Sequence, residues 1–307
     1  MAMTGVLRPG LAQIRVLDID AAVKHYVEHV GLMKVGTCGD GRVMLKGRDE
    51  FDHHSLVLRP SDQAGFDLFA FKVESDEALS AFEKRLTAYG VEVTPVAAGE
   101  QPGFGRRIAF TLPSGHRIDL YAEVARADEI PDVENPYIWK SVPHGMGAIR
   151  MDHILLYGPD IDKNLDIFEN CLDFKLAEKV DDPEGNVFAI WLTCSNKAHD
   201  IAFVRHPEPG KLHHVAFFIE DWNAIGHAAD VMVREDIAID LGPTRHGITR
   251  GQTIYFFDPS GNRNEVFAGG YTFYPDDPVR TWSFDQVGRG IFYYERALNE
   301  RFLGVVT

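Results

Sequence analysis

The stretch PSGHRIDLY at residues 113–121 recurs as PSGNRNEVF at residues 259–267. Three earlier segments match in the same order, although with low identity, so that roughly residues 8–125 correspond to residues 148–270. A pattern that repeats in this way indicates duplicated structural modules. We therefore expect the two halves of the chain to share one architecture.

Each half carries the signals of helices separated by short strands. Apolar residues within residues 23–30 recur at helical spacing, with Asp20 as the expected N-cap and Gly31 as the expected stop. A second helix is expected after Ser75, and Asp221 begins its counterpart in the second half. Short runs rich in β-branched and aromatic residues lie between them and predict strands. The expected fold class is α+β, with four repeated β-α-β-β-β modules forming two similar domains, each with a curved mixed sheet.

The composition is typical of a globular protein, with 45% apolar and 25% charged residues. A formal net charge of −15, without a concentrated Lys/Arg stripe, argues against nucleic acid as a partner. No run of about 18 apolar residues could span a membrane, and residues 1–10 lack the features of a signal peptide. The three cysteines include no CxxC pair, so they support neither a disulfide framework nor a thiolate zinc site. We expect a cytoplasmic protein with no membrane partner.

The two halves differ at three positions where the second half gains better metal ligands. The residues of the first and second half at these positions are Gln13 against His153, Leu68 against His214, and Asp119 against Glu265. All lie in expected strands, and one face of a curved sheet can bring residues of separate strands together. Two imidazoles and a carboxylate hold non-haem Fe(II) while leaving other coordination positions open. Packed histidines and an ordinary strand carboxylate remain the alternative, and Asp119 could itself bind metal.

Two motifs resemble the extradiol ring-cleavage dioxygenases of the vicinal-oxygen-chelate superfamily, most closely the catechol 2,3-dioxygenases. They are LHHVAF at residues 212–217 and GQTIYFFDPSGNRNE at residues 251–265. The resemblance extends from LRPG at residues 7–10 to LNERF at residues 298–302, which is essentially the whole chain. It implies extradiol (meta) cleavage of catechol by O₂ to 2-hydroxymuconate semialdehyde, in bacterial degradation of aromatic compounds. It also implies a homotetramer.

The resemblance implies roles for individual residues. One Fe(II) per chain would be held by His153, His214 and Glu265, and Mn(II) is possible because the same ligands suit both ions. His199 would act as the acid/base group, since an ordinary histidine pKa of about 6.5 allows it to accept and return a proton. His246 and Tyr255 would hydrogen-bond a substrate oxygen. A surface loop position for His199 and core packing for Tyr255 are the plain alternatives.

The wall of the substrate pocket is expected to be apolar, because it must hold a planar ring. The resemblance places the following residues in it: Trp191, Ile248, Thr249, Ile291 and Phe302. Arg245 and Arg250 flank His246 and could recruit a catechol that carries a carboxylate, although solvated loop positions are the favoured interpretation. Catechol itself is therefore the expected substrate, with a substituted catechol as the alternative.

The expected domain organisation follows from the repeat and from a Pro/Gly-rich stretch between the halves. The predicted divisions are a metal-free N-terminal domain at 1–130, a linker at 131–147, a catalytic metal-binding domain at 148–270, and a C-terminal segment at 271–307 that covers the active-site domain. A helix is expected at residues 294–302 of that segment.

Two other functions are possible on the same modules. A glyoxalase-like isomerase would draw metal ligands from both halves, whereas Gln13 and Leu68 leave the first half poor in ligands. A metal-free sequestering protein would not need three good ligands together with His199, His246 and Tyr255. Both alternatives are less favoured than the dioxygenase.

Overall fold

The computed structural model describes residues 5–128, 131–134, 143–304 and 306–307. The elements of its first half are β1 (Val6–Val16), α1 (Ile19–Lys24), η1 (His25–Val30), β2 (Met33–Thr37), β3 (Val43–Lys46), β4 (Leu56–Pro60), β5 (Gly65–Val73), α2 (Asp76–Tyr89), β6 (Thr94–Val96), β7 (Arg107–Thr111) and β8 (Arg117–Tyr121). A short 3₁₀ turn, η2 (Asp132–Glu134), follows.

The second half repeats this series and then adds a further segment. Its elements are β9 (Arg150–Gly158), α3 (Ile161–Cys171), β10 (Lys175–Asp181), β11 (Val187–Thr193), β12 (Ile201–Arg205), β13 (Lys211–Phe218), α4 (Trp222–Arg234), β14 (Ile239–Arg245), β15 (Gly251–Phe257), β16 (Arg263–Gly269), β17 (Arg280–Ser283), η3 (Phe284–Gln286), α5 (Val287–Ile291) and α6 (Glu300–Gly304).

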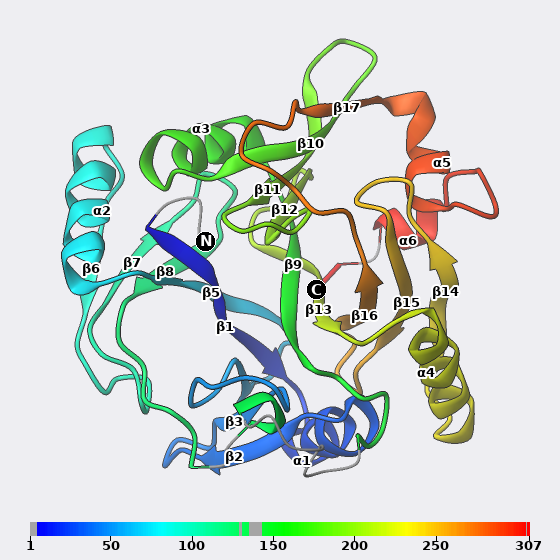
Figure 1. Ribbon diagram of the computed structural model, residues 1–307, viewed down its shortest axis with the longest axis horizontal. Coiled ribbons are helices and arrows are strands. Elements are labelled where there is room, and N and C mark those ends of the chain that lie inside the picture. The colour runs from blue at the N-terminus through cyan, green and yellow to red at the C-terminus, as the bar shows by residue number, and fades with distance from the viewer. Residues whose placement is uncertain (1–4, 129–130, 135–142, 305) are drawn as a thin grey trace.

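The two mixed sheets have the same topology, one in each half of the chain (Figure 1). The first has the order β2-β3-β4-β1-β5-β8-β7-β6, and the second, read from its far end, has β17 followed by β10-β11-β12-β9-β13-β16-β15-β14. In every module the first strand lies parallel to the last, as β9 does to β12. The predicted α+β fold of four β-α-β-β-β modules in two domains is confirmed.

The helix ends follow the expected capping chemistry, with one correction. Ser75 and Asp221 cap α2 and α4 by accepting hydrogen bonds from backbone N–H groups of the first turn. Gly31 ends η1 with a φ of 96°, which suits glycine. The prediction of Asp20 as N-cap was wrong, because the Asp18 side chain accepts from the backbone nitrogens of Asp20 and Ala21.

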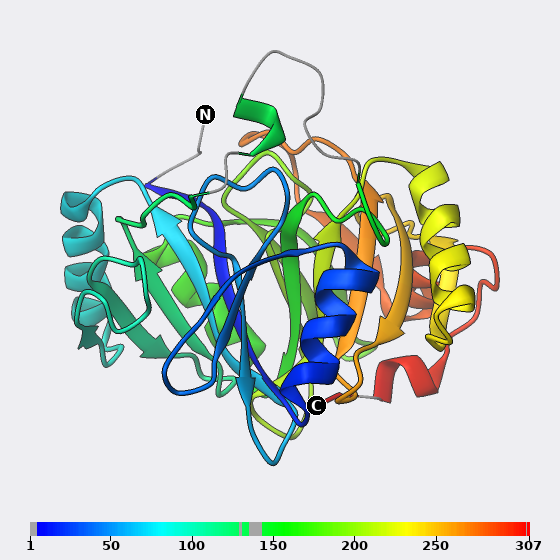
Figure 2. The ribbon, with the colours of Figure 1, turned by 90° about the horizontal axis from the view of Figure 1, so that it is seen from below.

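The helices of each half also pack against the other half, so the domains share one hydrophobic core. Figure 2 shows α1 crossing in front of the strands of the second half. In η1, which continues α1, the His25 ring bonds the Asn264 amide oxygen at 2.9 Å, and the Tyr26 hydroxyl donates to Asp258 at 3.1 Å. In the reciprocal contact, the Asn164 amide of α3 donates to the Ser114 hydroxyl at 2.7 Å.

The C-terminal segment differs most from expectation. Strand β17 extends the second sheet beside β10, with Glu178 opposite Arg280, and it was not predicted. The helix expected at 294–302 was wrong in extent, because α6 begins at Glu300 and the residues before it form turns. Arg296 has a φ of 58°, a left-handed conformation that a right-handed helix cannot include.

The divisions between the predicted domains stay predictions. Strand β8 ends at Tyr121 and β9 begins at Arg150, but residues 135–142 of the predicted linker lie outside the described part of the chain. No helix in that described part is long and apolar enough to cross a membrane.

Candidate metal centre

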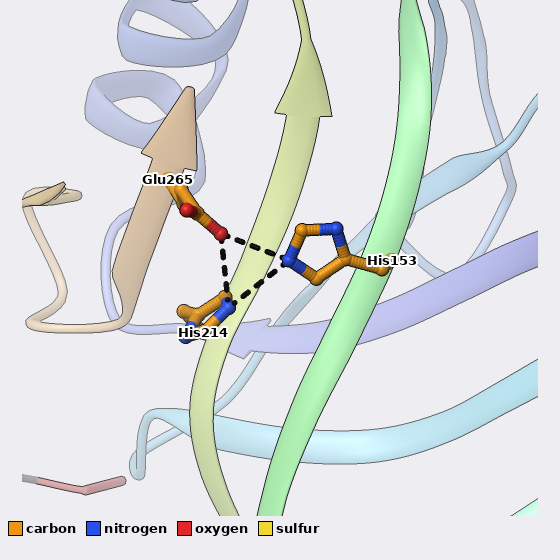
Figure 3. A group of neighbouring side chains, drawn as sticks. All are labelled: His153, His214 and Glu265. Carbon is orange, nitrogen blue, oxygen red and sulfur yellow. Dashed lines mark hydrogen bonds and ion pairs between the residues drawn. The ribbon is translucent and has the colours of Figure 1, made fainter. Parts of the chain in front are cut away.

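Three adjacent strands bring His153, His214 and Glu265 together, one residue from each of β9, β13 and β16 (Figure 3). The Glu265 Oε2 atom lies 2.9 Å from Nε2 of His153 and 3.1 Å from Nε2 of His214. The two Nε2 atoms are 3.4 Å apart. The predicted ligand atoms therefore converge on one point, and all three side chains are buried.

The geometry fits an octahedral metal ion. Metal–ligand bonds of about 2.1 Å at right angles place neighbouring donor atoms about 3 Å apart, which is close to the three observed separations. Two imidazoles and one carboxylate on one face leave the opposite face for other ligands. The cluster is therefore a buried His-His-Glu metal site. A bound ion would lie between the two imidazoles and the carboxylate, and these groups would then contact the ion.

The equivalent position in the first half is closed to metal. Asp119, the counterpart of Glu265, pairs with Arg107 at 3.2 Å and with Arg117 at 2.8 Å. The prediction that Gln13 corresponds to His153 was wrong, because the strand registers place Leu11 at that position. Leu11 and Leu68 both pack in the apolar core. Guanidinium groups thus neutralise the carboxylate that was considered as a possible ligand.

Outer partners fix the orientation of the ligands. The Asp152 Oδ2 atom lies 2.9 Å from Nδ1 of His153, and the Thr253 hydroxyl donates to Glu265 Oε1 at 2.5 Å. Burial alone would raise the pKa of Asp152, but Lys197 and His153 hold it well below its usual range. An Nδ1–H directed at a carboxylate leaves Nε2 free to bind metal. Apart from its place beside His153, nothing in the sequence indicated a role for Asp152.

The predicted acid/base residue lies beside the triad. The His199 ring centroid is 4.0 Å from that of His153, and the side chain is only 5% exposed. Its position in the pocket excludes the surface-loop alternative. Burial, followed by the neighbouring His153, lowers the pKa of His199 well below its ordinary value, so the ring is neutral at pH 7.

His246 and Tyr255 form a hydrogen-bonded pair beside His214. His246 Nδ1 lies 2.7 Å from the carbonyl oxygen of Ile291, and its Nε2 lies 2.8 Å from the Tyr255 hydroxyl. Burial lowers the pKa of His246, so the neutral ring donates from Nδ1 and accepts the tyrosine proton at Nε2. The Tyr255 ring also packs at 5.2 Å from His214. Core packing and a polar role coexist at Tyr255.

The triad lies in a pocket whose wall is apolar. All five predicted wall residues line it, together with further apolar side chains: Trp191, Ile248, Thr249, Ile291, Phe302, Leu155, Tyr157, Val180, Phe188, Ala189, Val204 and Val287. Neither flanking arginine is among the lining residues. The Arg245 guanidinium lies 4.6 Å from the Trp222 ring centroid, and Arg250 lines a separate cavity.

Two family models match the chain. The Glyoxalase/Bleomycin resistance protein/Dioxygenase superfamily matches residues 150–266, and the catechol 2,3-dioxygenase-like N-terminal domain matches residues 66–125. A metapyrocatechase of Pseudomonas sp. (strain CF600) is 47% identical over 99% of both chains. A manganese-dependent 2,3-dihydroxybiphenyl 1,2-dioxygenase of Geobacillus genomosp. 3 is 30% identical over 90% of both.

Solved structures of dioxygenases have the same fold. The 2,3-dioxygenase LapB of Pseudomonas sp. KL28 superposes with a TM-score of 0.88 at 46% identity, covering 92% of this chain and 99% of that one. Homoprotocatechuate 2,3-dioxygenase of Brevibacterium fuscum gives 0.87 at 25% identity, covering 98% and 92%. The 47% identity to a metapyrocatechase over nearly the whole chain, the two matching family models and the buried metal site agree. The chain belongs to the catechol 2,3-dioxygenase (metapyrocatechase) family of extradiol dioxygenases.

Proposed function

We propose that this enzyme opens catechol with O₂ to 2-hydroxymuconate semialdehyde at Fe(II) held by His153, His214 and Glu265. The observation that carries the proposal is the buried triad at the base of an apolar pocket, with His199 on one side and Tyr255 on the other. Membership of the extradiol family supports the reaction class, and the pocket chemistry supports the substrate.

The residues of the site have complementary tasks. Bound Fe(II) supplies Lewis acidity toward the catechol oxygens and a path for electrons from the ring to O₂. Glu265 contributes one negative charge, so that a singly deprotonated catechol makes the site neutral overall, which favours binding in a low-dielectric pocket. Neutral His199 accepts the remaining catechol proton and returns it later in the reaction. The Tyr255 hydroxyl, which His246 holds in position, turns its O–H toward a substrate oxygen when the substrate binds and so stabilises the charge there.

The lining supports a catechol without a charged substituent. No Lys or Arg side chain is found among the described residues that line the pocket. A carboxylate-bearing catechol would be buried there without a cationic partner, which is costly. Catechol or an alkyl-substituted catechol fits, whereas homoprotocatechuate does not. A preference for homoprotocatechuate over catechol and 3-methylcatechol would contradict this choice.

Iron is the proposed metal, with Mn(II) as the second candidate. The same His-His-Glu ligands suit both ions, and one relative is manganese-dependent by name. The site ligands come from the second half alone, which does not favour a glyoxalase-like isomerase that shares ligands between halves. The family resemblance further supports a homotetramer, and the composition supports a cytoplasmic location.

The first test is turnover after anaerobic reconstitution with Fe(II), followed by catechol and air. We expect rapid formation of the yellow ring-opened product, and His214→Ala should lose both the iron and the product because one of three ligands is missing. The control is His227→Ala, which removes an exposed histidine of α4 and should keep full activity. Bound iron without product from any catechol would indicate another chemistry, and failure to bind iron would favour a sequestering protein.

A further inference from the structure

A buried carboxylate outside the metal centre joins three parts of the second domain. Glu178 lies on β10 and is 1% exposed. Its Oε1 atom accepts the backbone N–H of Thr249 at 2.7 Å, and its Oε2 atom accepts the indole N–H of Trp282 at 2.7 Å. Thr249 belongs to the loop between β14 and β15, and Trp282 belongs to β17 of the C-terminal segment. Glu178 therefore connects β10 to both.

The loop that Glu178 holds has an unfavourable backbone conformation. Thr249 and Arg250 have φ angles of 58° and 56°, in the left-handed region that side chains other than glycine seldom adopt. Such conformations persist only where the surroundings over-determine them. The hydrogen bond from the Thr249 N–H to Glu178 fixes the loop at the strained position itself.

The same loop forms part of the substrate pocket. Ile248 and Thr249 line the pocket, and His246 precedes them. The backbone nitrogens of Gly247 and Ile248 both donate to the carbonyl oxygen of Gly290, at 2.8 and 3.1 Å. These hydrogen bonds join the loop and α5 into one wall, and Glu178 and Trp282 connect this wall to the sheet.

Comparison of the two halves shows that this carboxylate is a feature of the second half. The pairing of β10 with β11 has an irregularity between Leu176 and Glu178, and the pairing of β2 with β3 has the same irregularity between Lys34 and Gly36. Gly36 is therefore the counterpart of Glu178. The first half lacks this carboxylate, and its described residues include no strand beyond β2 at this edge of the sheet.

We propose that Glu178 is a positioning residue for the substrate pocket: its carboxylate fixes the 246–250 loop to β17 and so sets the wall against which the catechol ring binds. Glu178 touches neither the metal ligands nor the pocket interior, so it acts through Thr249 and Trp282. The inference rests on the proposed function of the pocket, and it concerns which residue determines substrate affinity.

The test is Glu178→Gln, which keeps the side-chain volume but sets an NH₂ group against one of the two N–H donors. Leaving a buried donor unsatisfied is enough to raise the KM for catechol about tenfold, while kcat falls less than about threefold because the triad and His199 are unchanged. Iron content should equal that of the wild type. Backbone amide hydrogen exchange at residues 246–250 and 280–291 should become faster.

A second variant and a control separate positioning from general stability. Trp282→Phe removes one of the two donors, and its effect on KM should not add to that of Glu178→Gln in the double variant. Asp258→Asn weakens another buried, multiply hydrogen-bonded carboxylate at the β15–β16 turn, and it should lower the melting temperature without changing KM.

Unchanged KM and unchanged exchange in Glu178→Gln would overturn the proposal. An equal rise of KM in Asp258→Asn would also overturn it, because KM would then simply follow stability. Hydrogen exchange needs no substrate, so the positioning role is tested even if wild-type enzyme fails to turn over catechol, a failure that would contradict the proposed function instead.

Discussion

His199 differs from the other imidazoles of the site in having room to exchange a proton. His153 and His214 face Glu265, and His246 is bonded at both nitrogens, whereas His199 lies beside His153 at the pocket wall. Burial lowers its pKa, so the neutral, basic form is present throughout the neutral pH range. A neutral imidazole near the substrate oxygens is suited to accept a proton from them.

We expect His199→Asn to bind catechol but to turn it over far more slowly. Asparagine keeps a polar group at the position but cannot take up a proton, and loss of a general acid/base group lowers kcat by about 10²- to 10⁴-fold. Steady-state kinetics and anaerobic catechol titration would measure the two effects separately. His54→Asn, at the equivalent position of the first half, is the matched control and should leave kcat unchanged. Normal turnover by His199→Asn would exclude the acid/base role.

The duplication made the metal ligands predictable from the sequence, whereas the residues that hydrogen-bond to the ligands and to the pocket loop could not be predicted. Comparing the two halves singled out His153, His214 and Glu265, and the structure brings them together. Asp152, Thr253 and Glu178 had no such signal, because their contacts depend on strand register and on segments distant in sequence. The pattern of residue types reveals ligands more readily than the side chains that orient them.

The elements that join the halves are the first helices of modules one and three. Helix α3 presents Asn164, whose amide donates to the Ser114 hydroxyl at 2.7 Å and accepts the Ser114 N–H at 3.3 Å. Both residues are fully buried. Helix η1, which continues α1, makes the reciprocal contact through His25 and Asn264. These hydrogen bonds therefore position the helices within an otherwise apolar junction.

Asn164→Ala should lower the free energy of unfolding by about 1–2 kcal/mol. The buried Ser114 N–H loses its partner, which costs about 1–3 kcal/mol, and the better helix propensity of alanine returns less than about 0.7 kcal/mol. Equilibrium denaturation in urea would measure the difference. Asp166→Ala on the exposed side of the same helix should change stability by less than about 0.5 kcal/mol. Equal stabilities for both variants would show that this junction contact contributes nothing.

Among the elements, the repeated modules were predictable and the C-terminal segment was not. Ser75, Gly31 and Asp221 mark helix ends by local chemistry that can be read from the sequence. Strand β17 is short and has no counterpart in the first half, and it is a strand only because β10 offers a free edge. Its existence depends on tertiary contact rather than on local propensity.

The whole molecule divides its chemistry between two similar domains. In the second, three ligands create a place for a cation, and in the first, Arg107 and Arg117 supply the positive charge themselves. The two domains nevertheless share one core, and buried histidines lie on both sides of the junction: His25 contacts Asn264, and His116 contacts the Lys211 carbonyl. The stability of the folded protein at low pH therefore depends on contacts between the two halves.

We expect stability to fall as the pH drops from about 6.5 to about 4, with His25 and His116 contributing to the loss. Burial lowers the pKa of each to about 4, below the value of about 6.5 in the unfolded chain. Over this range the unfolded state binds protons that the folded state does not, so each histidine contributes a loss of up to about 1.4 kcal/mol per pH unit.

Urea denaturation at several pH values would measure this slope in the wild type and in the His25→Gln/His116→Gln double variant. The double variant should show a shallower fall, because glutamine takes up no proton in either state and the contribution of the metal ligands is the same in both proteins. His144→Gln, at an exposed position, should keep the wild-type slope. An unchanged slope in the double variant would mean that protonation elsewhere accounts for the loss and that the junction histidines do not limit acid stability.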